Sequence, residues 1–181
     1  MSKKIFPLLL LIATIFSACE NDLATINKIA SLKEANVETI KNVTTYYSDK
    51  GILKAQLQSP LVLEYNVKEP YKELPNGVLV LFYNEEKKED GRLKAKYGIS
   101  YDAQNKIVVK HDVEVVNVKG EKLNTDELTW DTKAHILYTD KPVKITTGKE
   151  ILFGDGMTAK EDFSEYKIKH LTGTVKMKND L

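Results

Sequence analysis

The chain has 181 residues, of which 42% are hydrophobic, with 27 Lys and Arg against 26 Asp and Glu and a single cysteine. This near-neutral balance argues against nucleic acid as a partner, and one cysteine excludes an intramolecular disulfide. The length suffices for one domain with a substantial core, and nothing in the composition marks a second domain.

Residues 1–18 have the pattern of a secretion signal. Lys3 and Lys4 precede an apolar run from Ile5 to Phe16, and the small residues Ser17 and Ala18 follow it. The run has 12 residues, fewer than the roughly 20 that a helix needs to span the hydrocarbon core of a membrane. We therefore predict a signal peptide over 1–18 that is removed by processing.

Cys19 follows Ser-Ala directly, as in a bacterial lipobox, and it has no disulfide partner in the chain. We predict that Cys19 is the lipid anchor of a lipoprotein, because a diacylglyceryl thioether and an N-acyl chain such as palmitate together give stable attachment. The alternative is a stray thiol near the cleavage site. Cleavage before Cys19 leaves 163 residues with 25 Lys and Arg against 26 Asp and Glu.

Residues 19–42 are predicted to form a tether. The stretch from Leu23 to Asn42 has no Gly or Pro, and Leu23, Ile26, Ile29 and Leu32 are spaced by three. This spacing favours a short amphipathic helix, and a loosely ordered spacer is the alternative structure. The apolar stripe suits contact with a membrane or a partner, but a simple spacer is the favoured role.

From Val43 onward the sequence predicts an all-β domain over residues 43–178. Short segments rich in Val, Ile, Tyr and Thr alternate with turn residues, and almost no helical pattern occurs, which indicates a sandwich, a jelly roll or a barrel. We expect strands near 43–48, 52–58, 61–67, 78–84, 92–101, 106–111, 113–118, 122–130, 134–139, 142–147, 150–153, 156–160, 163–169 and 171–177.

The sequence between Gly91 and Thr147 contains two copies of a unit of β structure. The first copy opens at Gly91 and reaches Tyr101-Asp102, and the second opens at Gly120 and reaches Trp130-Asp131, an offset of 29 residues. In the segment from Leu93 to Tyr101, every second residue is apolar or aromatic. That alternation predicts a sheet with one buried face.

The inward, apolar face of this sheet is the feature of the domain that most suggests a function. If two sheets pack closely, the inward side chains close the core; if the sheets splay, the same side chains line a groove for hydrocarbon chains. The sequence leaves both arrangements open. The predicted inward residues are Leu53, Ala55, Val80, Phe82, Leu93, Ala95, Tyr97, Ile99, Tyr101, Val113, Val115, Leu123, Leu128, Trp130, Ile136, Tyr138, Val143, Ile145, Phe153, Met157, Ile168 and Val175.

Candidates for catalysis are weak. No G-x-S-x-G, P-loop, G-x-G-x-x-G or C-x-x-C motif occurs, and a metal site built from His111, His135 and His170 across strands is a minor alternative. The aspartates that attract notice in the repeated units are best explained as turn caps, namely Asp102, Asp126 and Asp131. We predict no enzyme activity, no cofactor and no metal.

The segments from Gly120 to Asp131 and from Ile136 to Ile145 resemble the LptC family, in the lipoprotein form found in Bacteroidetes-type bacteria. The resemblance implies a twisted, splayed antiparallel β-jelly roll without catalysis. It further implies that the chain accepts lipopolysaccharide from an inner-membrane ABC transporter and passes it along an apolar groove to the next, LptA-like jelly-roll protein. Neighbours in such a bridge join by edge-strand pairing, which assigns the edges near 43–58 and 165–177 to partners.

The expected location is periplasm-facing and lipid-anchored, in the inner membrane, with the outer membrane as the alternative. Better-known members of the family use an uncleaved N-terminal helix in place of an acylated cysteine. Two other classes of protein fit the same sequence. A lipocalin-like carrier would form a closed up-and-down barrel, and a structural or surface-exposed β-sandwich lipoprotein would have a closed core.

Overall fold

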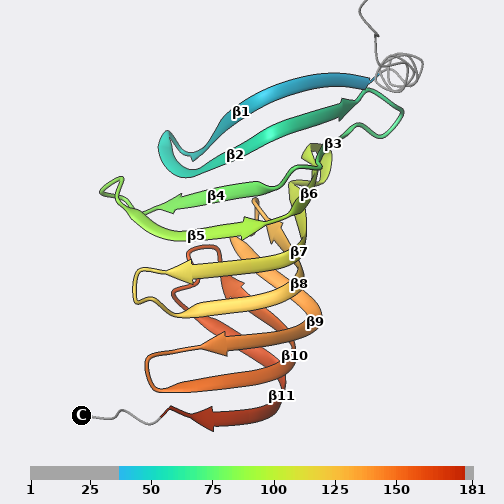
Figure 1. Cartoon of the computed structure of the whole chain (residues 1–181). Helices are drawn as coiled ribbons and strands as arrows, with labels where there is room; N and C mark the ends of the chain where they lie inside the picture. Colours follow the sequence, from blue (N-terminus) through green and yellow to red (C-terminus); the bar gives the residue numbers. More distant parts are fainter. Residues whose placement is uncertain (1–36, 178–181) are drawn as a thin grey trace, which may run out of the picture. The chain divides into compact units, whose positions relative to one another are not determined.

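The computed structural model describes residues 37–177, which form one antiparallel sheet of eleven strands (Figure 1). This all-β architecture is consistent with a β-jelly roll and confirms the predicted fold class. A short 3-10 helix, η2 (Asp102–Gln104), lies between two of the strands. The strands are β1 (Val37–Asp49), β2 (Ile52–Tyr65), β3 (Tyr71–Leu74), β4 (Val78–Tyr83), β5 (Glu89–Ala95), β6 (Tyr97–Tyr101), β7 (Lys106–Asn117), β8 (Lys122–Asp131), β9 (Ile136–Thr146), β10 (Glu150–Lys160) and β11 (Tyr166–Lys176).

The first strand begins earlier than the sequence pattern indicates. Residues 37–42, which we assigned to the tether, belong to β1. Most side chains of β1 are exposed, so its sequence lacks the regular alternation of a half-buried strand. The predicted signal peptide, Cys19 and the rest of the tether lie outside the described residues.

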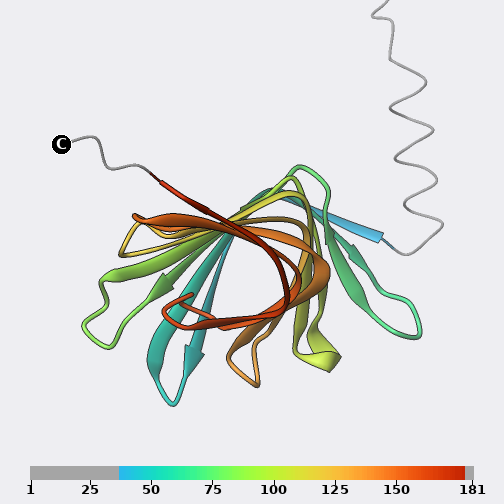
Figure 2. The same cartoon turned by 90° about the horizontal axis from the view of Figure 1, so that it is seen from below.

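Several segments that we predicted as separate strands are single long strands with a bend. β7 covers two predicted segments and bends at His111 and Asp112, where φ is +64° and +52°. β10 likewise covers two segments, and its pairing with β9 shifts between Asp155 and Met157. Such β-bulges interrupt the ladder locally and bend the strand, and the pairing resumes beyond them. Figure 2 shows the result, a sheet that folds back so that its halves face each other.

Two long strands, β2 and β7, each pair with two different strands along their length. β2 pairs with β4 through Ala55–Gln58 and with β3 through Leu63–Tyr65. β7 pairs with β5 through its C-terminal half and with β6 through its N-terminal half. The turn at Pro75-Asn76-Gly77, with φ +94° at Gly77, and the bend at Lys96 separate the two sets of ladders. β2 and β7 therefore each contribute to both facing halves.

One continuous row of inward side chains crosses nine strands. Each member pairs with the next across a ladder, and the row includes five of the predicted inward residues. Its central members are fully buried, so the row forms the base of the hydrophobic core. In order from β1 to β11, the row is Thr45, Leu57, Val80, Leu93, Val115, Leu123, Ile145, Leu152 and Thr174.

Candidate functional site

An apolar cavity of about 450 Å³ lies between the facing halves of the sheet at the β1 end. Its volume falls within the range of sites that bind small ligands, and such sites are also mostly apolar. The walls come from strands far apart in the sequence. The apolar and aromatic wall residues are Ile40, Val43, Tyr46, Tyr47, Ala55, Leu57, Val62, Leu74, Ile107 and Trp130.

The inward face of the β1–β2 hairpin supplies one wall of the cavity. Tyr47 pairs with Ala55 and Ile40 pairs with Val62 across the ladder, so apolar side chains from both strands reach the same space. Among the described strands, β1 pairs only with β2. This wall is therefore carried by an edge strand that has no second neighbour in the sheet.

Trp130 is the most buried aromatic residue that lines the cavity. Its side chain is 2% exposed, and its ring makes edge contacts with Tyr47 at 5.7 Å and with Phe82 at 5.2 Å between centroids. The indole Nε1 donates a hydrogen bond of 3.1 Å to Oε2 of Glu161. These contacts fix the ring on several sides, because aromatic pairs prefer such edge-to-face geometry.

The interior is filled on the far side of Trp130. Leu123, Leu128, Leu137 and Ile145 have no exposed surface, and they belong to one contiguous cluster of buried residues. Protein cores pack with few voids larger than a water molecule. The described interior therefore has an open part near β1 and a closed part towards β11.

The mouth of the cavity has a polar rim with charges of both signs, formed by Glu64, Lys72, Ser100, Asp102 and Lys106. Nζ of Lys72 donates a 2.5 Å hydrogen bond to Asp102, which also accepts one of 2.6 Å from Ser100. The bond to Asp102 raises the pKa of Lys72. Burial raises the pKa of Asp102, but its two hydrogen bonds outweigh burial and leave that pKa below its usual value.

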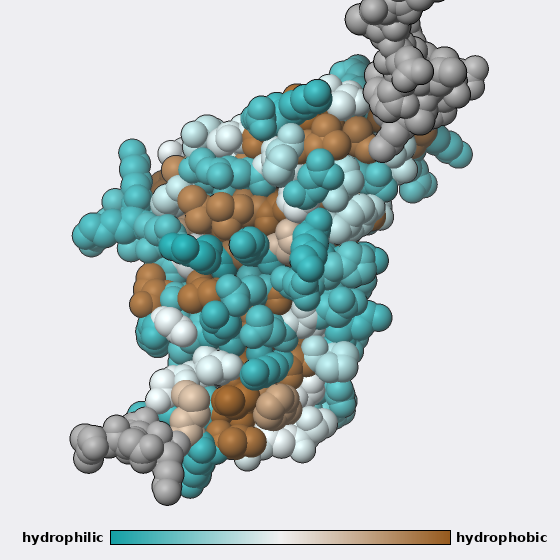
Figure 3. Space-filling view, viewed as in Figure 1, coloured by the Kyte–Doolittle hydropathy of each residue, from teal (hydrophilic) through white to brown (hydrophobic). Residues whose placement is uncertain are grey.

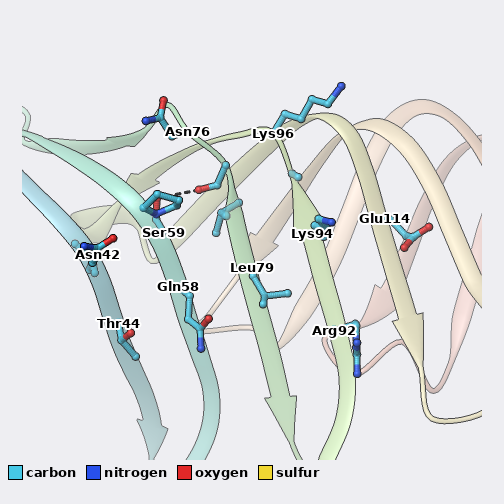
Figure 4. A pocket seen from close by; sticks show the side chains of 15 residues that line it. Asn42, Thr44, Gln58, Ser59, Asn76, Leu79, Arg92, Lys94, Lys96 and Glu114 are labelled. Atoms are coloured by element: carbon cyan, nitrogen blue, oxygen red, sulfur yellow. Dashed lines mark hydrogen bonds between the residues drawn. The ribbon is translucent and has the colours of Figure 1, made fainter.

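A second hollow, of about 1090 Å³, lies on the outer face of the sheet (Figure 4). Its side chains come from β1, β2, β4, β5 and β7, and a cross-strand row runs through Thr44, Gln58, Leu79, Lys94 and Glu114. Most of this row is polar or charged. The lining of the outer hollow is therefore more polar than that of the cavity, which makes it the poorer site for an apolar ligand.

Most of the predicted inward residues face the interior. Ile168 is half-buried and packs against the core, and Leu53 lies two positions before Ala55 in the same strand. Of the predicted set, only Ala55 and Trp130 line the cavity. The buried members are Ala55, Val80, Phe82, Leu93, Ala95, Val113, Val115, Leu123, Leu128, Trp130, Val143, Ile145 and Met157.

The prediction of an inward face was wrong for Tyr97, Ile99 and Tyr101. In β6 it is Gly98 that pairs with the buried Val109, so its neighbours in the strand point to the other face of the sheet. The bend at Lys96 separates β5 from β6 and resets the alternation. A shift of one residue moves every following side chain to the opposite face.

The same prediction was wrong for four residues of β9, β10 and β11. In β9 the buried Trp130–Leu137 pair puts Ile136 and Tyr138, the neighbours of Leu137, on the outer face. In β10 and β11, Phe153 and Val175 are 38% and 54% exposed. The physical cause is again the bend in each long strand, which the regular alternation does not reveal.

The alternation also missed residues of the interior and of the cavity. Leu57 and Val62 line the cavity from β2 and Tyr47 lines it from β1. Phe163, in the turn after β10, is completely buried and stacks on Tyr166 at 5.0 Å. The apolar character of Leu57 and Val62 was a usable signal, whereas the burial of a turn residue leaves no trace in a strand pattern.

The three histidines lie at separate places. His135 contacts Glu161 at 3.1 Å and Asp49 at 3.9 Å, and His111 lies 3.5 Å from Asp126. Within residues 37–177 no three His, Cys, Asp or Glu side chains are grouped closely enough to hold a metal ion.

Of the aspartates interpreted as turn caps, Asp131 has that role. Its Oδ1 accepts hydrogen bonds from the backbone N–H groups of Lys133 and Ala134. The interpretation was wrong for Asp102, whose carboxylate accepts hydrogen bonds from Lys72 and Ser100, and for Asp126, which faces His111.

No helix in the described part of the chain is long and apolar enough to cross a membrane. A search of curated proteins finds no match to this sequence. The family model described as "Lipopolysaccharide-assembly, LptC-related" matches residues 7–176, which is most of the chain. This family is one of transport components and not of enzymes. The chain therefore belongs to the LptC-related family, and it is an envelope-associated component of lipopolysaccharide assembly.

Proposed function

We propose that this chain accepts lipopolysaccharide from an inner-membrane ABC transporter and passes it to the next β-jelly-roll protein on the way to the outer membrane. The observation that carries the proposal is the apolar cavity with a polar rim, in a β-jelly roll of the LptC-related family. Acyl chains occupy the cavity while the sugar and phosphate head stays in water. The driving energy comes from ATP hydrolysis in the transporter.

The cavity supplies enough apolar surface to hold an acyl chain during transfer. Each buried CH₂ group contributes about 0.8 kcal/mol, so a chain that buries several of them is held firmly yet reversibly. Leu57, Val62 and Leu74 provide the apolar contacts. The buried residues beyond Trp130, which we predicted as groove lining, act in this proposal as core.

The edge strand β11 is the proposed contact with the next jelly-roll protein. Among the described strands, β11 pairs only with β10, which leaves its other edge free to extend the sheet. Apolar side chains gather at this end of the unit, at the bottom of Figure 3, and Leu171 and Val175 are among the exposed ones. Lys167, Lys169 and Lys176 on the same strand discourage pairing with wrong partners.

The proposed anchor is the lipidated Cys19, in the inner membrane, as in a lipoprotein form of the family. Cys19 directly follows the small residues Ser17 and Ala18. Two or more acyl chains give stable attachment. An anchor in the outer membrane is the alternative and would change which partner the chain meets first.

The test is photo-crosslinking in cells that carry the whole transporter. A photoreactive residue is placed at Leu57 or Val62 in the cavity, and at Tyr138 or Lys94 on the outer face as controls. Adducts with lipopolysaccharide are expected at the cavity positions only, and they should disappear when ATP hydrolysis is blocked. If well-expressed cavity variants give no adducts, the proposal is wrong.

The second candidate is a structural lipoprotein with a closed core. The filled interior beyond Trp130 favours it, since most of the facing surfaces are packed together there. This candidate predicts that depletion of the protein leaves lipopolysaccharide transport intact. A lipocalin-like barrel fits less well, because β1 and β11 do not pair with each other to close the sheet.

A further inference from the structure

We infer that the interior space filled by Phe163 is a second site for an acyl chain, occupied in this structure by the protein's own turn between β10 and β11 (residues 161–165). The inference rests on the proposed function and deepens it, because it names where a hydrocarbon chain lies on its way from the cavity towards β11. Lipid that moves along the interior displaces the turn and takes the place of the aromatic side chain.

The turn between β10 and β11 contacts strands that lie far from it in the sheet. Oε2 of Glu161 accepts the indole hydrogen bond of Trp130 from β8, and the backbone N–H of Glu161 donates a 3.2 Å bond to the carbonyl of His135. The carbonyl oxygen of Asp162 lies so close to Gly91 of β5 that a methyl group added there would be 3.0 Å from it. The turn therefore runs between the facing halves of the sheet.

Phe163 is the residue of this turn that enters the core. Its side chain has no exposed surface and belongs to the cluster of buried residues. A buried aromatic side chain covers about 150–250 Å² of surface, and each buried CH₂ group corresponds to roughly 30 Å² at the usual energy per area. When Phe163 leaves the interior, it therefore uncovers apolar space for several methylene groups of a hydrocarbon chain.

The turn connects the cavity with the proposed partner edge. On one side it reaches Trp130, which lines the cavity, through the hydrogen bond to Glu161. On the other side the ring of Phe163 stacks on Tyr166, the first residue of β11, at 5.0 Å between centroids. A chain that leaves the cavity towards β11 therefore meets the space that Phe163 occupies.

The turn is held less firmly than the strands on either side of it. Pairing in the β10–β11 ladder ends at Ala159 and Tyr166, so the turn lies outside the ladder. A φ of +56° places Phe163 in the left-handed region, which residues other than glycine seldom adopt because Cβ crowds a backbone carbonyl. Strained segments with few ladder bonds open more readily than paired strands. The turn therefore swings out while β10 and β11 stay paired.

The polar group that holds Phe163 keeps partners after the turn has moved. Nδ2 of Asn117 donates a 3.0 Å hydrogen bond to the carbonyl of Phe163 and another, of 2.8 Å, to Glu121. Oδ1 of Asn117 accepts hydrogen bonds from the backbone N–H groups of Lys119 and Glu121. Displacing the turn removes only the first of these bonds, so the buried amide of Asn117 remains satisfied.

An acyl chain has the differential affinity that displacement requires. A ligand shifts a conformational equilibrium only through contacts that it makes in one state and not in the other. A hydrocarbon chain finds apolar surface in this space only after Phe163 has left, so its burial favours the displaced turn.

The test uses a reversible lock on the turn. The 3.2 Å backbone bond between Glu161 and His135 brings the two main chains close enough for a disulfide, so His135→Cys with Glu161→Cys ties the turn to the β8–β9 turn. A photoreactive residue is placed at Tyr166 or at Leu57, in cells that carry the whole transporter. With the lock reduced, lipopolysaccharide adducts are expected at both positions. With the lock oxidised, adducts at Tyr166 should fall at least tenfold while those at Leu57 persist.

A second variant acts in the opposite direction and needs no disulfide. Phe163→Leu leaves part of the space empty and should raise the yield of adducts at Tyr166, relative to Leu57, severalfold. Phe153→Leu replaces an exposed aromatic residue of β10 and is the matched control, with an unchanged ratio. For the lock, Glu161→Cys alone is the control and should give adducts at both positions.

The possible failures are distinguishable. Equal yields at Tyr166 with the lock oxidised and reduced, or an unchanged ratio in Phe163→Leu, would overturn the second site and leave the cavity as a lipid site. Adducts at Leu57 without any at Tyr166 in the unlocked protein would do the same. Absence of adducts at Leu57 in every variant would count against the proposed function itself. The lock and Phe163→Leu are independent, so the test stays decisive if one of them does not fold.

Discussion

The hydroxyl group of Tyr47 donates a 2.6 Å hydrogen bond to the backbone carbonyl of Thr132, which lies 85 residues later in the chain. Tyr47 is in the edge strand β1, whereas Thr132 is in the turn between β8 and β9. This bond fastens the wall of the cavity to the opposite half of the folded sheet. Burial raises the pKa of Tyr47, so its hydroxyl stays a donor at neutral pH.

Replacing Tyr47 by Phe removes this bond and keeps the ring. We expect the free energy of unfolding to fall by about 1–2 kcal/mol, because a partly buried carbonyl loses its partner. Urea denaturation with an unchanged m-value would measure the loss. Tyr46→Phe is the control, since Tyr46 is 63% exposed and its change should stay within about 0.5 kcal/mol. Equal losses in the two variants would contradict the role of the bond.

The pair Phe163→Ala and Phe153→Ala tests which aromatic residues near β10 are inside. Phe163 is completely buried, whereas Phe153 is among the exposed residues. Phe163→Ala should lower the free energy of unfolding by about 3–5 kcal/mol, as for other buried Phe side chains. Phe153→Ala should lower it by about 1 kcal/mol or less. Thermal or urea unfolding of both variants measures the difference. A larger loss of stability in Phe153→Ala than in Phe163→Ala would contradict the exposed position of Phe153 and support the inward position that its sequence pattern predicted.

The fold was predictable because alternation is a local property. In β4 and β5, where the register stays constant from Val78 to Phe82, Val80, Phe82, Leu93 and Ala95 all face inward as predicted. The prediction failed beyond the bend at Lys96, although the apolar pattern continues without a break. A bend of this kind depends on pairing with β3 and β7, which is decided by tertiary structure and not by the residues of the strand itself.

The cavity was less predictable than the fold. The sequence left open whether the inward residues close a core or line a groove, and the structure has both a cavity beside Trp130 and a filled core. Whether an inward residue meets a void or a neighbour depends on the facing half of the sheet. β1 supplies Ile40 and Tyr47 to the cavity. Most side chains of β1 are exposed, and their order in the sequence does not indicate that some of them line a cavity.

Tyr97 provides a prediction for alkaline pH. Burial, and then a 2.8 Å hydrogen bond to Glu73, raise the pKa of Tyr97 well above its usual value. The folded state therefore favours the protonated phenol. Its contribution to stability is complete below the unfolded pKa of about 10 and is lost as the pH rises towards the folded pKa.

Above about pH 10, the free energy of unfolding should therefore fall less steeply with pH in Tyr97→Phe than in the unaltered protein. Urea unfolding at a series of alkaline pH values measures the two slopes. Absorbance of the phenolate should also show one late-ionising tyrosine fewer in the variant. Identical slopes and identical titrations would mean that Tyr97 ionises as freely when folded as when unfolded.

The exposed apolar residues of β11 give a prediction about partners. Leu171→Lys combined with Val175→Lys should weaken binding of the next jelly-roll protein roughly tenfold or more, because apolar contacts at the centre of an interface carry much of its energy. Binding of the purified proteins can be measured by titration. Tyr46→Lys, on the opposite edge strand, is the control. Unchanged affinity in a stably folded double variant would rule out this end of the sheet as the contact.

Cys19 gives the last prediction, which concerns attachment to the membrane. Cys19→Ala should abolish incorporation of labelled palmitate, because Cys19 is the single cysteine of the chain and supplies the thioether on which lipidation depends. Ser17→Ala keeps the small-residue pattern before the cysteine and should be labelled normally. Labelled palmitate is followed after gel electrophoresis. If the unaltered protein takes up no label, or Cys19→Ala takes up as much, the chain is held at the membrane by another segment.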